Sequence, residues 1–394
     1  MVQREKYLAQ LWQWKDRQII KVVTGVRRCG KSTLLQQFRE ELQTDGIPAE
    51  RIVSINFEAL ENEPLLEYHA LYNEVKAHLK EGEKTYVFLD EVQNVPDFQK
   101  AVDALFILPE ADLYITGSNA KLLSGELATL LSGRYVEIAM LPLSFTEFRQ
   151  LTGQERDEAW RSYFRCGGFP FAAGLTDDAV RRDYLNGIYH TVLLKDVVQR
   201  NKVQDVALLE SVIRYLFANV GSIISAKKLS DSLVSAGRKT TSATVERYLT
   251  ALQECFLIYR IGRYDIAGKQ YLQSLDKYYM VDHGLRGLLL TDRQSDVGHV
   301  LENIVFLELK RRGYRISIGK MGDTEVDFVA ENGNGRSYFQ VSASVLDGST
   351  YAREIHPLKQ IRDSYPKTIL TLDDYSMDDE GIRVVNVKDW LESL

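Results

Sequence analysis

Short apolar runs alternate with longer amphipathic stretches along the first 150 residues of the chain. The apolar runs are Ile19–Thr24, Thr85–Leu89, Asp112–Gly117 and Tyr135–Ile138. Runs of this length are typical of buried parallel strands, and the stretch from Thr33 to Phe38 has the spacing of a helix. The pattern therefore predicts an α/β fold built on a parallel sheet.

Helical spacing dominates residues 151–205, and the helix expected at Asp178–Gln199 carries its apolar residues on one face. Farther on, the pattern predicts helices at Ile223–Leu233, Thr241–Gln253 and Val297–Arg312, and strands at Phe256–Ile261, Gln270–Leu272, Glu325–Ala330 and Ser337–Ser342. A chain of 394 residues is longer than one typical domain. We predict four segments, residues 1–150, 151–205, 206–290 and 291–394.

A phosphate-binding motif follows the first predicted strand. Residues 25–32 fit G-x-x-x-x-G-K-[ST] at each fixed position. A Gly-rich loop lets successive backbone N–H groups point at phosphates, and a helix that begins at Lys31 adds its positive N-terminal end. We expect Lys31 to reach the β- and γ-phosphates of ATP and the Ser32 hydroxyl to bind Mg²⁺. The expected nucleotide contacts are Gly25, Val26, Arg27, Arg28, Cys29, Gly30, Lys31, Ser32 and Thr33.

Polar residues end the next two predicted strands. Asp90 and Glu91 follow the run that begins at Thr85, and Ser118 and Asn119 follow the run that begins at Asp112. We expect Asp90 to lie behind the Mg²⁺ shell and Glu91 to polarise the attacking water, with an ordinary strand-end acid as the alternative for Glu91. Because ligands collect at the carboxyl edge of a parallel sheet, Ser118 and Asn119 are candidates for contacting the γ-phosphate or the water.

Arg134 lies where the fourth predicted strand begins. An arginine in this place could act as a finger on the nucleotide of a neighbouring subunit, or it could form a salt bridge within its own domain. Both interpretations stay open.

The order GVRRCGKST, VFLDE, YITGSN, LSGRYVEIAMLPLSFTEF and CGGFP resembles that of the AAA+ type P-loop ATPases of bacteria and archaea that carry a C-terminal domain of unknown function. The resemblance covers nearly the whole chain. It implies that Gly25–Thr33 is Walker A, that Asp90 and Glu91 are Walker B, that Ser118 or Asn119 is the first sensor, and that Arg134 is a candidate finger.

The same resemblance implies that residues 1–150 form the P-loop ATPase domain and that residues 151–205 form a helical lid. In the lid, Gly168-Phe169-Pro170 would pack near the nucleotide base, and a plain turn between helices is the alternative. The implied function is hydrolysis of ATP to ADP, coupled to the C-terminal domains. Two alternatives stay open: an ATP-regulated metal-dependent nuclease, and a nucleotide sensor without hydrolysis that serves as a scaffold for a protein partner.

The composition of the chain indicates the cellular location that we expect for the protein. The three cysteines, Cys29, Cys166 and Cys255, lie far apart, which argues against a disulfide framework. No basic segment followed by an apolar core opens the sequence, and no run reaches 18 apolar residues. We therefore expect a cytoplasmic protein without a membrane span, and a homo-oligomer stays open.

The formal net charge of the chain is −6, but one region of the sequence is basic. Residues 221–280 contain nine Lys or Arg and five acids, which gives +4. The pattern of residues 206–290 suits a winged helix-turn-helix, a motif that places the start of its second helix on base edges and its Lys or Arg side chains on phosphates. We expect contact either with duplex DNA or with protein. The residues expected to contact DNA are Lys239, Thr240, Thr241, Ser242 and Arg247.

Residues 291–394 resemble the PD-(D/E)-x-K nuclease superfamily. The resemblance rests on Glu302 in a predicted helix and Asp327 in a predicted strand. Where the superfamily has Glu-x-Lys, this chain has Gln340-Val341-Ser342, which removes a metal carboxylate and the cation that steadies the attacking water. The sequence therefore predicts a nuclease-like α/β fold without nuclease activity.

Overall fold

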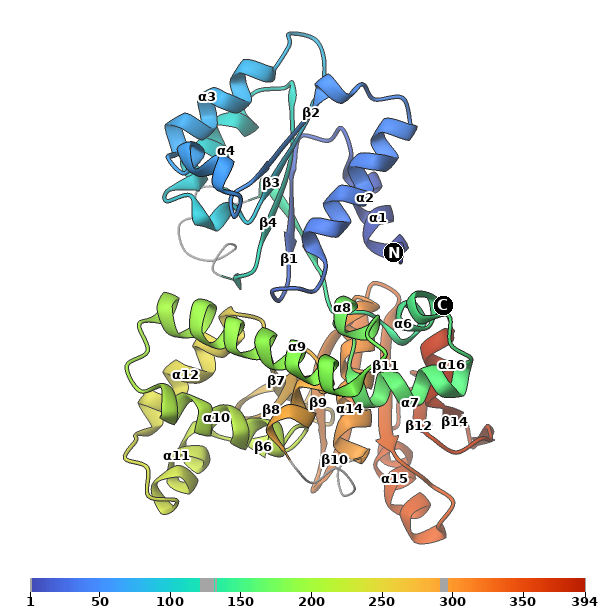
Figure 1. The fold of residues 1–394 in the computed structure, drawn as a ribbon. Helices are drawn as coiled ribbons and strands as arrows, with labels where there is room; N and C mark the ends of the chain where they lie inside the picture. The colour runs from blue at the N-terminus through green and yellow to red at the C-terminus, as the bar shows by residue number, and fades with distance from the viewer. Residues whose placement is uncertain (1, 121–130, 132, 291–296, 394) are drawn as a thin grey trace. The chain divides into compact units, whose positions relative to one another are not determined.

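The computed structural model describes residues 2–120, 131, 133–290 and 297–393 (Figure 1). The chain folds as two units. One unit comprises Met1–Pro142 with Glu254–Phe256, and the other comprises Leu143–Gln253 with Leu257–Leu394.

Five parallel strands form the sheet of the first unit, in the order β2-β3-β4-β1-β5. They are β1 (Ile20–Thr24), β2 (Ile52–Asn56), β3 (Thr85–Asp90), β4 (Ala111–Gly117) and β5 (Tyr135–Ala139). β1, β3 and β4 are buried along their whole length, which explains their apolar sequences. Two charged residues in these strands, Lys21 and Asp112, form a buried ion pair with each other. The predicted parallel α/β sheet is confirmed.

Helices cover both faces of this sheet, with α1 and α2 on one face and α3 and α4 on the other (Figure 1). They are α1 (Glu5–Trp14), α2 (Lys31–Thr44), α3 (Tyr68–His78) and α4 (Phe98–Phe106), with 3₁₀ turns at Ala49–Arg51, Leu60–Leu65 and Val92–Asn94. On the α3 and α4 face, Val22, Leu89 and Ile115 belong to one apolar core with Val75 and Leu105.

The second unit contains a mixed sheet of nine strands in the order β13-β14-β12-β11-β10-β9-β7-β8-β6. The strands are β6 (Ile223–Ile224), β7 (Ile258–Asp265), β8 (Gln270–Met280), β9 (Arg315–Met321), β10 (Thr324–Asn332), β11 (Gly335–Ser342), β12 (Lys367–Thr371), β13 (Met377–Asp379) and β14 (Ile382–Asn386). Parallel pairing joins β7 to β9, β11 to β12 and β12 to β14.

The helices of this unit are α6 (Phe145–Thr152), α7 (Arg156–Cys166), α8 (Pro170–Ala173), α9 (Asp178–Thr191), α10 (Val206–Ala218), α11 (Ala226–Ser235), α12 (Ser242–Glu254), α13 (Arg286–Leu289), α14 (Val297–Arg311), α15 (Gly348–Gln360) and α16 (Val387–Glu392). α9 continues as a π-helix, Val192–Gln199, and a 3₁₀ turn spans His283–Leu285. Within the described residues, no helix is both long enough and apolar enough to span a lipid bilayer.

One predicted helix begins later than the sequence suggested. We predicted a helix from Ile223, but Ile223–Ile224 is the strand β6, and α11 begins at Ala226. The Ser225 side chain accepts a hydrogen bond from the Lys228 N–H at 3.1 Å, which caps the helix there. The two β-branched isoleucines pair with β8 instead.

The division into four segments stays a prediction. One continuous sheet contains strands from residues 206–290 and from residues 291–394, because β7 pairs with β9 across the expected boundary.

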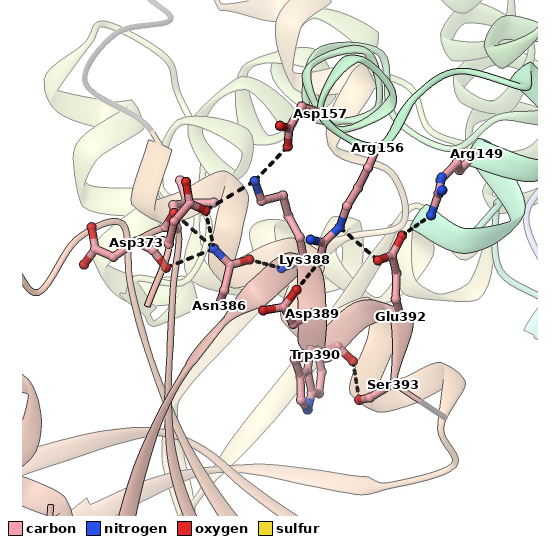
Figure 2. Close-up of polar contacts among 12 residues, drawn as sticks. Arg149, Arg156, Asp157, Asp373, Asn386, Lys388, Asp389, Trp390, Glu392 and Ser393 are labelled. Atoms are coloured by element: carbon pink, nitrogen blue, oxygen red, sulfur yellow. Dashed lines mark hydrogen bonds and ion pairs between the residues drawn. The ribbon is translucent and has the colours of Figure 1, made fainter. Parts of the chain in front are cut away.

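Ion pairs hold the last helix, α16, against α6 and α7 (Figure 2). Glu392 accepts from Arg149 at 2.7 Å and forms an ion pair with Arg156 at 2.9 Å, and Lys388 lies 2.9 Å from Asp157. The Asn386 side chain caps the start of the helix by accepting from the Lys388 N–H at 2.8 Å. These contacts tie residues far apart in the sequence into one unit.

Candidate functional site

The P-loop connects β1 to α2 at the carboxyl edge of the five-stranded sheet. Gly30 has a φ of 107°, a left-handed value that favours glycine. At Gly25, a Cβ atom would lie 2.3 Å from the Met140 carbonyl oxygen, so only glycine fits under this strand end. Both fixed glycines of the motif are thus required by the backbone.

Lys31 lies inside the loop and is 4% exposed. Its Nζ lies 3.2 Å from the Gly25 carbonyl oxygen and 3.3 Å from Oε1 of Glu91. Burial lowers the pKa of Lys31, but the charge of Glu91 outweighs it and raises that pKa above its usual value. The structure therefore brings the lysine of the first motif into contact with the second acid of the second motif.

Glu91 accepts hydrogen bonds from two further side chains. Ser118 Oγ donates to Oε2 at 3.0 Å, and the Gln93 amide donates to the same oxygen. Burial raises the pKa of Glu91, but Lys31, Gln93 and Ser118 together with Arg27 lower it to about 2. This carboxylate is thus ionised at neutral pH.

Thr116 in β4 contacts both acidic residues at the end of β3. Its hydroxyl donates to Asp90 Oδ1 and accepts from the backbone N–H of Glu91 at 2.9 Å. Asp90 and Glu91 are both buried, at 8% and 6% exposure. A single hydroxyl on the neighbouring strand therefore contacts both the carboxylate of Asp90 and the backbone of Glu91.

The other predicted residues of the first unit are placed as follows. Ser32 is exposed in the first turn of α2, where its hydroxyl is open to a ligand, and Asn119 is buried just after β4. Within the loop, Val26, Arg27 and Cys29 are buried and Arg28 is exposed, and Thr33 follows Ser32 in α2. A hydroxyl oxygen at Ser32 and a carboxylate at Asp90 are ligands of the kind that Mg²⁺ binds.

Arg134 forms a salt bridge with Asp103 of α4, within its own unit. Its guanidinium carbon also lies 5.4 Å from the centre of the Phe106 ring. The salt-bridge interpretation thus has a partner in the structure, and the finger role stays a prediction.

Pro170 belongs to the second unit, where it begins α8. The turn before it is anchored by Asp282, which accepts from the Gly168 N–H at 2.6 Å. Its expected contact with a nucleotide base stays a prediction.

Sequence reasoning did not single out Thr116 or Gln93. Thr116 is a polar residue near the end of a mostly apolar run, and Gln93 lies two positions after Glu91. These positions are the only features of the sequence that we see as pointing to a role for either residue. Pairing of β3 with β4 brings Thr116 to the two acids.

A second polar cluster lines a cavity of about 500 Å³ in the second unit. Glu302 of α14, Glu325 and Asp327 of β10 and Glu354 of α15 all line it. Lys277 of β8, 4% exposed as a side chain, lies 3.2 Å from Glu302, 2.7 Å from Glu325 and 3.7 Å from Asp327.

This cluster adds two residues that the sequence did not lead us to place there, Glu354 and Lys277. Gln340, which replaces the expected acid, donates to Glu354 at 2.8 Å, and Lys277 supplies a cation from a different strand. Burial and the neighbouring Glu302 raise the pKa of Asp327. Among the residues that the structure describes, no group of three or more His, Cys, Asp or Glu is arranged to hold a metal ion.

Comparisons with known proteins agree with the fold of the first unit. Residues 17–149 match the model of an AAA domain, and residues 157–296 match that of a domain of unknown function (DUF8612). A Walker-type ATPase of Pyrococcus abyssi shares the fold with a TM-score of 0.52 and 15% identity, over 73% of this chain and 96% of that one.

Two full-length relatives are also similar in sequence. An uncharacterised protein of Methanocaldococcus jannaschii is 29% identical over 94% of this chain and 85% of its own length. An uncharacterised protein of Haemophilus influenzae is 41% identical over 99% of this chain and 98% of its own length. The chain thus belongs to the same family as this Haemophilus influenzae protein, with an AAA domain of the P-loop ATPase type at residues 17–149.

Proposed function

We propose that this protein binds ATP with Mg²⁺ at the P-loop and hydrolyses it to ADP and phosphate. The observation that carries the proposal is the convergence of Lys31, Glu91 and Ser118 at one edge of the sheet, with Nζ of Lys31 3.3 Å from Glu91 and Oγ of Ser118 3.0 Å from it. A phosphate-binding lysine and a fixed carboxylate side by side are the parts that hydrolysis requires, whereas binding alone needs no base.

Each residue has one proposed role. The loop N–H groups and Lys31 bind the phosphates, and Glu91 accepts a proton from the attacking water. Ser32 and Asp90 hold Mg²⁺, which neutralises charge on the phosphate oxygens. Ser118 keeps Glu91 in place, and Asn119 contacts the γ-phosphate.

Steady-state ATP turnover tests this proposal. Phosphate release by the wild-type protein should require Mg²⁺ and should be lost in Glu91→Gln, with Glu81→Gln as an exposed control. ATP binding without any turnover would favour the non-hydrolysing scaffold instead.

The C-terminal unit is the proposed output of the ATPase. This proposal has four further parts. They are a helical lid, a winged helix that contacts duplex DNA, a role of Arg134 on the nucleotide of a neighbouring subunit, and the formation of a homo-oligomer. α11 and α12 support the DNA contact, because Lys227, Lys239 and Arg247 are exposed on or beside them. Protein contact through the same surface is the alternative.

We also propose that the nuclease-like fold does not cut DNA. Lys277 already forms ion pairs with Glu302 and Glu325 from inside the cluster, so a divalent cation would have to displace a buried ammonium. Wild-type protein should leave plasmid DNA intact in Mg²⁺ or Mn²⁺, with or without ATP. Metal-dependent cutting that Asp327→Ala abolishes would make the ATP-regulated nuclease the main function.

A further inference from the structure

The helix α1 precedes the P-loop in sequence and packs beside it in the first unit. Trp12 Nε1 of this helix donates to Glu41 of α2 at 2.6 Å, and its ring meets Phe38 of α2 edge-on at 5.3 Å. Tyr7, Leu8 and Leu11 of the helix are buried. α1 is therefore packed firmly against the helix that follows the P-loop.

Arg4 lies directly before α1 and is 3% exposed. Its guanidinium donates to the carbonyl oxygen of Cys29 in the P-loop at 3.3 Å and to that of Leu141 at 2.7 Å. Tyr7 supports this arrangement, because its hydroxyl accepts from the Leu141 N–H at 3.1 Å and its ring centre lies 4.9 Å from Arg4 Cζ. One side chain thus joins the loop to the segment that follows β5.

The contact with Cys29 fixes the direction of the next backbone donor. In a planar trans peptide, the C=O of one residue and the N–H of the next point in opposite directions. Because the Cys29 oxygen turns toward Arg4, the N–H of Gly30 turns away from Arg4. The segment that contains Met140 and Leu141 also packs closely against the loop. A Cβ atom added at Gly25 would lie only 2.3 Å from the Met140 carbonyl oxygen.

We propose that Arg4 is a positioning residue for phosphate binding. It holds the Cys29–Gly30 peptide so that the Gly30 N–H faces the β-phosphate of the nucleotide. This inference rests on the proposed binding of ATP at the P-loop. Arg4 does not touch the reacting atoms, so its effect belongs to binding and not to the chemical step.

Calorimetric titration with ADP and ATP tests the role of Arg4. Arg4→Met removes both donors and keeps a long apolar side chain, so the Kd for both nucleotides should rise about tenfold, the scale of one hydrogen bond to a charged group. AMP affinity should change less than twofold, because AMP has no β-phosphate. The KM for ATP should rise about tenfold while kcat stays within about twofold.

Two matched variants separate this role from general packing of α1. Tyr7→Phe removes the hydroxyl contact with Leu141 but keeps the contact between Arg4 and Cys29, so nucleotide affinity should stay within twofold of wild type. Arg4→Lys keeps a donor that can reach Cys29 and should recover part of the lost affinity.

Three results would overturn the inference. They are a folded Arg4→Met protein with wild-type ADP affinity, an equal loss of affinity in Tyr7→Phe, and, if Arg4→Met does not fold, wild-type ADP affinity in a folded Arg4→Leu protein, which also lacks both donors. Failure of the wild-type protein to bind either nucleotide would instead overturn the proposed ATP binding, and the role of Arg4 with it.

Discussion

At the scale of single residues, the contact between Lys31 and Glu91 connects the proposed binding of ATP to its proposed hydrolysis. Phosphate oxygens would compete with the Glu91 carboxylate for the Lys31 ammonium, since both are anionic acceptors. As Lys31 turns to phosphate, it stops lowering the pKa of Glu91, and the carboxylate becomes a stronger base. ATP itself would thus prepare Glu91 for its proposed role as the base.

Replacing Lys31 by alanine should weaken ATP binding roughly 10- to 100-fold, because the loop N–H groups cannot replace a cation on the γ-phosphate. Calorimetry with ATP measures the change, and Lys80→Ala, at an exposed position after α3, is the matched control. Unchanged affinity in Lys31→Ala would contradict the assignment of the P-loop.

Replacing Glu91 by glutamine should leave ATP bound and slow hydrolysis by roughly 10²-fold or more, the usual scale for loss of a general base. Single-turnover phosphate release measures the chemical step. A native rate in this variant would show that Glu91 is not the base.

At the scale of elements, the sequence predicted the parts that are local and missed those that depend on pairing. The P-loop and the acids at the end of β3 were predicted because glycine, lysine and carboxylate stand at fixed spacings within one segment. Thr116 reaches Asp90 only because β4 pairs with β3, and Lys277 reaches Glu302 from a different element. The spacing of residues within one segment does not predict contacts between different strands or helices.

The buried carboxyl group of Asp282, which contacts the turn before α8, predicts that the stability of the protein depends on pH. Asp282 accepts from the N–H groups of Gly168 and Gly284 at 2.6 and 2.8 Å. Burial nevertheless raises its pKa from 3.8 to about 7. The folded state therefore keeps a proton that the unfolded state releases, and this stabilisation, complete below pH 3.8, is lost as the pH rises to about 7.

Relative to Asp282→Asn, the wild-type free energy of unfolding should fall by up to about 1.4 kcal/mol per pH unit between pH 5 and 7, and level off above that. Urea unfolding at each pH measures the difference. Burial lowers the pKa of His283 to about 4, so titration of His283 changes the free energy of unfolding with pH in the opposite direction. His283 is present in both proteins, so its contribution cancels in the difference between them. Parallel curves for the two proteins would rule out titration of Asp282 in this range.

At the scale of the whole molecule, a formal net charge of −6 coexists with a segment of +4. If that segment contacts DNA, Lys239→Gln with Arg247→Gln should weaken binding and flatten the log–log salt dependence by about two units, roughly one per lost phosphate contact. Fluorescence anisotropy with a labelled duplex measures both. Lys80→Gln with Arg182→Gln, two exposed changes outside the segment, is the control. Absence of salt-dependent binding by wild-type protein at low ionic strength would assign the segment to protein contact.

The pairing of β7 with β9 decides where the protein can be shortened. Tyr264 pairs with Gly319 and Asp265 with Lys320, so a protein that stopped at residue 290 would keep the pairing of β7 with β8 but expose the edge of β7 that pairs with β9. Such an exposed edge recruits other chains, and we expect that fragment to precipitate. A break between Pro142 and Leu143 separates no paired strands. We therefore expect that residues 206–290 do not fold as an independent module, because β7 pairs with a strand that the ribosome makes later.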